Sequence, residues 1–223
     1  MIMKQQTQAP RFEPRWPVAL AFLVMVSLFA LLPERLMLLP GWFLYVVAVA
    51  LLAPMAGVGL TAARRRWLRI EHTSMLLFVV FAGAVTLANL ANLIGAMLHR
   101  SVEVSGLQLL ESSIAVWLTN VLTFSLLYWQ IDRGGPEARV NNAGGKPDWL
   151  FPQEGARNED VPQGWRPAFV DYLFLGYSTA TAFSTTDVMP LTARAKLLMM
   201  LESTISLATI VVVAARAINI LGS

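Results

Sequence analysis

Hydroxyl side chains gather near the carboxyl end of the sequence and lead into an acidic residue. Thr181, Ser184, Thr185 and Thr186 come before Asp187, in a stretch that is otherwise mostly small and apolar. Oxygen atoms of this kind can replace part of the hydration shell of a cation when they line a narrow path. The run therefore predicts a path for cations rather than a centre for covalent chemistry.

Four further polar side chains, Glu202, Asn89, Asn92 and Asn120, lie in apolar surroundings. In a membrane span such residues are costly and raise the question of a functional site. For Glu202 the alternatives are a position on a pore or proton path, and an ion pair or a hydrogen bond to hydroxyl neighbours such as Ser203. Asn89 and Asn92 are three residues apart and share a helix face. The three asparagines predict hydrogen bonds between helices or positions along the path.

No pattern of catalytic or metal-binding residues is found in the sequence. The chain has no cysteine, and His72 and His99 stand apart from any cluster with metal-ligand spacing. A phosphate-binding glycine loop and a nucleophile elbow are also missing. We therefore predict a protein that is not an enzyme, with no cofactor and no metal.

The composition places these residues in a lipid bilayer. Of the 223 residues, 56% are hydrophobic and 14% are charged, and the mean hydropathy is +0.57. Soluble domains carry about 25% charged residues, and a helix needs roughly 20 apolar residues to cross the hydrocarbon core. We predict an all-α membrane protein with five transmembrane helices, plus a re-entrant or sixth helical segment at 168–190. The five helices are expected at 16–32, 42–63, 74–98, 107–129 and 194–221.

Basic residues set the expected orientation. They cluster in the amino-terminal tail and in the link at 64–69, and short loops rich in Lys and Arg face the cytoplasm. The amino terminus is therefore expected inside a bacterial inner membrane. The pI of 9.6 follows from these juxtamembrane residues, and no nucleic-acid partner is predicted. We divide the chain into a cytoplasmic tail (1–15), a four-helix transmembrane region (16–130), a Pro/Gly-rich polar loop (131–167) and a carboxyl-terminal unit (168–223).

The polar loop contains an apolar knot at Trp149 and Phe151. Long loops inside compact domains are usually functional or disordered, and the aromatic rings favour partial order. The knot is expected to dock on the helix bundle or at the membrane surface. Trp149 and Phe151 are also candidates for binding a membrane protein partner.

The segment that begins at Asp171 resembles the pore loop of potassium channels. The resemblance rests on a short aromatic-rich helix, a Thr-rich strand, and Asp187, Pro190 and Thr192 ahead of a basic pair that opens a long helix. It departs where the family has two filter glycines, because Ser184 and Thr186 stand there. Such a filter needs the left-handed backbone that glycine supplies, so no potassium-selective filter is expected.

Most of the chain resembles uncharacterised bacterial inner-membrane proteins, a domain-of-unknown-function family. This resemblance implies an inner-membrane location and brings no activity with it. The phrases that carry it are 117–120, 128–136, 151–153, 171–173 and 214–221.

Two hypotheses of different classes follow. The first is an ion channel, which must be an oligomer because one loop cannot ring a pore, and a tetramer is the expected form. The second is a structural or accessory membrane protein that binds a partner, and a small transporter with a broken helix ranks after both.

Overall fold

The computed structural model describes residues 13–31, 41–60, 65–98, 106–141, 144–157, 159–162, 164–183 and 187–221 of the chain. Nearly all of its regular structure is helical, so the predicted all-α class is confirmed. In chain order the elements are α1 (Trp16–Leu31), α2 (Gly41–Leu60), α3 (Arg65–Leu98), α4 (Gly106–Ile131), η2 (Asp132–Gly134), α5 (Pro136–Val140), β1 (Trp149–Leu150), η3 (Pro152–Glu154), α6 (Phe169–Ala182), β2 (Met189–Pro190) and α7 (Ala193–Leu221).

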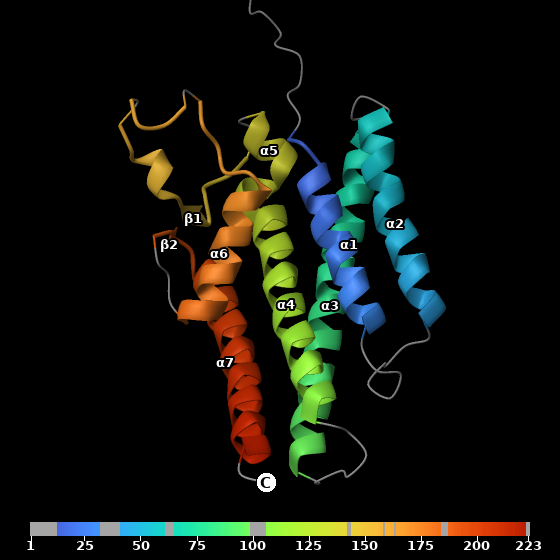
Figure 1. Cartoon of the computed structure of the whole chain (residues 1–223). Helices are drawn as coiled ribbons and strands as arrows, with labels where there is room; N and C mark the ends of the chain where they lie inside the picture. Colours follow the sequence, from blue (N-terminus) through green and yellow to red (C-terminus); the bar gives the residue numbers. More distant parts are fainter. Residues whose placement is uncertain are drawn as a thin grey trace, which may run out of the picture.

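The long helices form a bundle in which α1, α2, α3 and α4 alternate in direction along the chain (Figure 1). Helices α1, α3 and α7 run away from the end that carries α5 and β1, and α2 and α4 run toward it. We call that end the loop end. Helix α4 is central, since it contacts α1, α3, α6 and α7.

Three helices, α3, α4 and α7, are long and apolar enough to cross a membrane. Helix α2 contains Pro54, which membrane helices tolerate because neighbouring groups satisfy the freed carbonyl. The apolar parts of α1 and α2 within the described residues are shorter, at Trp16–Leu28 and Val49–Val58. Length and composition of the described helices therefore support three crossings, and the predicted count of five stays a prediction.

Aromatic side chains dominate the interior near the loop end. The rings of Tyr128, Trp129, Trp149 and Tyr172 are fully buried. The outer faces of the helices are apolar instead, with large exposed side chains such as Leu77, Val80, Leu197 and Met200. An apolar exterior around a polar-containing core is what a bundle surrounded by lipid requires.

The chain reverses direction directly after α4. Arg133 has a left-handed backbone with φ of 54°, and Gly134 and Gly135 follow at φ of 83° and 100°. Glycine adopts such angles without steric cost, and Pro136 then opens α5 in the first-turn position that suits proline. The predicted polar loop is thus partly ordered and packed on the bundle.

Candidate functional site

Helix α6 and strand β2 form a hairpin that starts and finishes at the loop end. At its start the Phe169 N–H donates to Glu13 Oε1 at 2.9 Å. At its finish the Leu191 N–H donates to the Asp148 carbonyl at 2.8 Å, and the Asp148 N–H donates to Asp132 Oδ1 at 2.8 Å. Both ends are fastened to the same end of the bundle, so the segment turns back instead of crossing it (Figure 1).

Capping groups define the two helices of this unit. Asp171 Oδ2 accepts the Ala168 N–H at 2.8 Å, which satisfies a free amide at the start of α6 as the sequence position of the carboxylate indicates. Phe183, with φ of 55°, ends α6. The Thr192 hydroxyl accepts the Ala195 N–H at 3.2 Å and therefore caps α7. In the pore-loop pattern Thr192 is a motif residue, and here its visible role is a helix cap.

The structure describes only some of the residues that were predicted to line an ion path. Thr181 is exposed near the end of α6, and its hydroxyl donates to the Tyr177 carbonyl at 2.7 Å within the helix. Asp187 is exposed just before β2. Ser184, Thr185 and Thr186 lie outside the described residues. The structure thus puts Thr181 and Asp187 at the surface of the hairpin, and their predicted role is not tested by it.

An open groove of about 640 Å³ is lined by residues of α6, β2 and α7. Its walls mix hydroxyl and apolar groups and carry one lysine. The groove is lined by Thr179 and Phe183 from α6 and, among others, by Lys196, Met200, Ser203 and Thr204 from α7.

Glu202, which is next to the groove-lining Ser203 in the chain, is fully buried. The Tyr128 hydroxyl donates to Glu202 Oε2 at 2.5 Å. Asn120 donates to Ser206 Oγ at 2.9 Å and to the Glu202 carbonyl at 3.2 Å. We call Asn120, Tyr128, Glu202 and Ser206 the interior cluster. It joins α4 to α7, so two of the predicted intramembrane polar residues, Asn120 and Glu202, lie at one site.

Gly176 allows α6 to approach this cluster closely. A Cβ atom at Gly176 would lie 2.4 Å from Ser125 Oγ, 3.2 Å from the Val121 carbonyl oxygen and 3.3 Å from Glu202 Oε1. The first distance is far below a real contact. Only glycine fits, and three oxygen atoms from α4 and α7 surround the α6 backbone there.

The other two predicted asparagines are not part of this site. Asn89 is buried, with an Oδ1 atom that has no hydrogen-bond partner, whereas Asn92 is exposed on α3. Their three-residue spacing brings them to one side of the helix but not into one environment. Neither is among the residues that line the groove.

The apolar knot of the long loop docks on the bundle, as its composition indicated. Trp149 is fully buried and Phe151 is 2% exposed. The Trp149 ring lies 4.7 Å from that of Tyr128, and its Nε1–H contacts Met199 Sδ at 3.3 Å. Phe151 packs edge-on against Tyr172. Both side chains thus pack inside the protein, and their candidate role in binding a partner stays a prediction.

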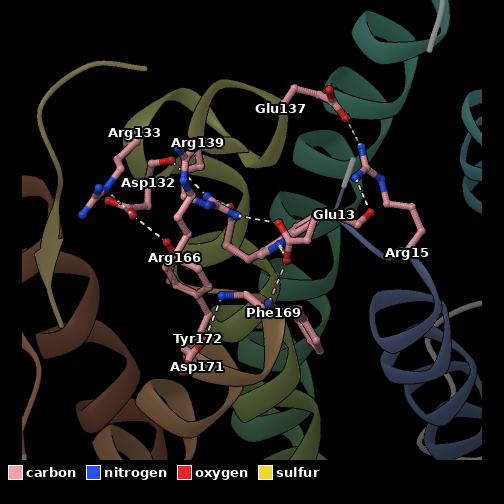
Figure 2. Close-up of polar contacts among 12 residues, drawn as sticks. Glu13, Arg15, Asp132, Arg133, Glu137, Arg139, Arg166, Phe169, Asp171 and Tyr172 are labelled. Atoms are coloured by element: carbon pink, nitrogen blue, oxygen red, sulfur yellow. Dashed lines mark hydrogen bonds and ion pairs between the residues drawn. The ribbon is translucent and has the colours of Figure 1, made fainter. Parts of the chain in front are cut away.

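The loop end also holds a network of buried and partly buried charges, most of which Figure 2 shows. We call this network the polar cap; its members are Glu13, Arg15, Glu71, Asp132, Glu137 and Arg139. Glu13 Oε1 accepts the Trp129 Nε1–H at 2.8 Å in addition to the Phe169 N–H, and Arg139 Nη2 lies 3.5 Å from Glu13 Oε2. One carboxylate therefore ties the chain ahead of α1 to α4, α5 and α6.

Arg15 and Arg139 connect the rest of the polar cap. Arg15 pairs with Glu71 at 3.0 Å and with Glu137 at 2.5 Å. Arg139 donates to the Trp129 carbonyl at 2.6 Å and to the Asp132 carbonyl at 3.0 Å.

Asp132 is the acceptor at the centre of the polar cap. The Tyr172 hydroxyl donates to the fully buried Asp132 carboxylate at 2.5 Å. Arg139 lies over the Tyr172 ring at 4.8 Å. Asp132 and Tyr172 are 40 residues apart in the chain, so no local pattern in the sequence links them.

No group of three or more His, Cys, Asp or Glu side chains in the described residues is arranged to hold a metal.

No family model matches the chain, and neither a curated protein nor a solved structure is significantly similar to it.

Proposed function

We propose that this is a multi-pass protein of the bacterial inner membrane, with five transmembrane helices, whose α6–β2–α7 unit lines an ion path in a homo-oligomer. The observation that carries the proposal is the hairpin, a 14-residue helix that turns back and is followed by a 29-residue helix. A helix of 14 residues is about 21 Å long, shorter than the roughly 30 Å hydrocarbon core. Irregular backbone at membrane depth is tolerated where it lines a water-filled cavity.

The positions of charged residues support one orientation. Arg15, Arg66, Arg69 and Lys196 all belong to the parts of the chain nearest the loop end. By the positive-inside rule that end faces the cytoplasm. The hairpin then enters from the cytoplasmic side and returns to it, and α7 ends on the opposite side.

The open side of the groove supports an assembly of several copies. In a single chain Thr204 and Thr181 are exposed on the outside of the bundle, and each hydroxyl donates to a carbonyl of its own helix, which leaves the oxygen free to accept. Packing copies around an axis, as in a tetramer, places these hydroxyls in a shared polar space. Ions would pass along side-chain oxygens, with Asp187 close to the cytoplasmic opening.

The test measures oligomeric state and ion flux together. The mass of the purified assembly, and hence its number of copies, is measured by native mass spectrometry from detergent. The same protein is reconstituted into liposomes for a cation-flux assay. Asp187→Asn is expected to lower the flux, because it removes a negative charge where cations approach. Asp160→Asn, an exposed acid in the loop between β1 and α6, is the matched control and should leave the flux unchanged.

A second variant addresses the path itself. Thr204→Trp places a bulky ring on the proposed axial face of α7 and should block the flux. Leu77→Trp, on the exposed face of α3, should not. A monomer that transports no cation, or equal flux in all four variants, would contradict the proposal.

A further inference from the structure

We propose that Glu202 is an intramembrane proton-binding site that exchanges its proton with the groove between α6 and α7. This inference stands on the interior cluster and does not require that the groove conduct ions. The carboxyl group is fully buried on a helix that is long and apolar enough to span a membrane. Its state of charge must therefore be settled by the groups around it.

The groups around the Glu202 carboxyl supply one hydrogen-bond donor to it and no positive charge. Tyr128 donates to Oε2 from α4, and Asn120 donates to the Glu202 main chain rather than to its carboxyl group. Helix α6 presents Gly176 at this point. Within the part of the chain that the structure describes, no ion pair involves Glu202. An isolated carboxylate in such surroundings is so costly that the group takes up a proton instead.

The second carboxyl oxygen is the atom on which the proton would lie. Glu202 Oε1 is buried and has no hydrogen-bond partner. It borders the space at Gly176, where Ser125 Oγ and the Val121 carbonyl oxygen also lie. An O–H on Oε1 thus has oxygen acceptors in its surroundings, while Oε2 accepts from Tyr128.

The residue that follows this acid in α7, Ser203, lines the groove together with Thr179 of α6. The Ser203 hydroxyl donates to the Thr179 carbonyl at 3.3 Å. Thr179 Oγ1 is buried without a partner on the same side. A small separation of α6 from α7 at this single hydrogen bond would bring water to Glu202, which is how the proton exchanges.

Infrared difference spectroscopy of the whole chain in lipid tests the site at neutral pH. A carbonyl band of a protonated carboxyl group is expected, and it should be lost in Glu202→Gln and kept in Glu111→Gln, an exposed acid on α4. Transfer to D₂O should shift the band to lower frequency. Absence of the band, or its persistence in Glu202→Gln, would overturn the proposal, and a band that D₂O leaves unshifted would overturn the exchange.

A second variant keeps the test decisive even where Glu202→Gln does not fold. Tyr128→Phe removes the hydrogen bond to Oε2, so the carbonyl band should move to higher frequency while remaining present. A band that does not respond to Tyr128→Phe belongs to another acid and would contradict the assignment. Loss of the band on adding NaCl at constant pH would show a sodium site in place of a proton site.

Discussion

The polar cap and the interior cluster solve the burial of charge in different ways. In the polar cap carboxylates are paired with arginines, as Glu13 is with Arg139 and Glu71 is with Arg15. In the interior cluster a single acid, Glu202, meets a phenol and amide and hydroxyl groups without charge. The first arrangement keeps ionised groups by pairing them, and the second suits an acid that is neutral.

The difference predicts unequal costs for breaking each region. Removing one partner of a buried ion pair leaves an uncompensated charge, which is strongly destabilising. Removing one hydrogen bond from a neutral pair costs much less. Variants in the two regions therefore test whether the buried acids of each region are ionised or neutral. The free energy of unfolding of every variant is measured by equilibrium unfolding in mixed detergent micelles.

Arg139→Met is expected to give the largest loss, about 3–5 kcal/mol, because it leaves Glu13 without its cation. The variant also frees the Trp129 and Asp132 carbonyls from their donor. Arg157→Met is the matched control, since Arg157 is an exposed residue with one weak surface pair, and it should change stability by less than about 0.5 kcal/mol. Equal effects of the two variants would remove the distinction between the polar cap and an ordinary surface network.

Gly176→Ala tests the packing around the interior cluster. The added methyl group would overlap Ser125 Oγ, and overpacking of this kind costs about 1–3 kcal/mol. Gly83→Ala is the control on α3, because a Cβ there meets nothing within 4 Å. A tolerated Gly176→Ala would mean that α6 does not lie against α4 as described.

Tyr128→Phe distinguishes a neutral Glu202 from an ionised one. With a neutral acid the loss of the hydroxyl should cost about 1 kcal/mol. With an ionised acid the same change would strip a buried charge of its donor and cost about 3 kcal/mol or more. Tyr177→Phe, on the half-exposed ring of α6, serves as the reference for a hydroxyl at the surface.

Thr192→Ala should have the smallest effect of the set, about 1 kcal/mol, through loss of the α7 cap. The variant also removes the Thr192 hydroxyl from Asp148, which it contacts at 2.6 Å. Thr204→Ala removes a hydroxyl that bonds only within its own helix and should be close to neutral. A loss no larger than that of Thr204→Ala would leave Thr192 without the structural role assigned to it.

Local patterns in the sequence were enough to predict the helices. The apolar blocks predicted the long helices, and the aromatic-rich stretch that begins at Asp171 predicted the short one. Glu202 stood out because a charge in an apolar block is rare. In each case the informative residues lie within a few turns of one another.

The polar cap was beyond such patterns because its contacts join distant parts of the chain. Glu13 meets Phe169 across 156 residues and Trp129 across 116. In the sequence Glu13 and Arg15 belong to a basic tail, where only their charge is informative. The contact between Trp149 and Tyr128 also joins distant parts of the chain. From the sequence alone, Trp149 was therefore a candidate for binding another protein.

The two-residue ladder of β1 and β2, which pairs Trp149 with Pro190 and Leu150 with Met189, also has a practical consequence. It anchors the chain before residues 152–164, and Arg166, bonded to the Val140 carbonyl at 2.5 Å, anchors it after them. Most of the described residues between these anchors are exposed. Lengthening a loop whose ends are already fixed costs only about 0.6 kcal/mol per doubling. This stretch is therefore the natural place to splice in a fluorescent reporter or an affinity tag without disturbing the bundle.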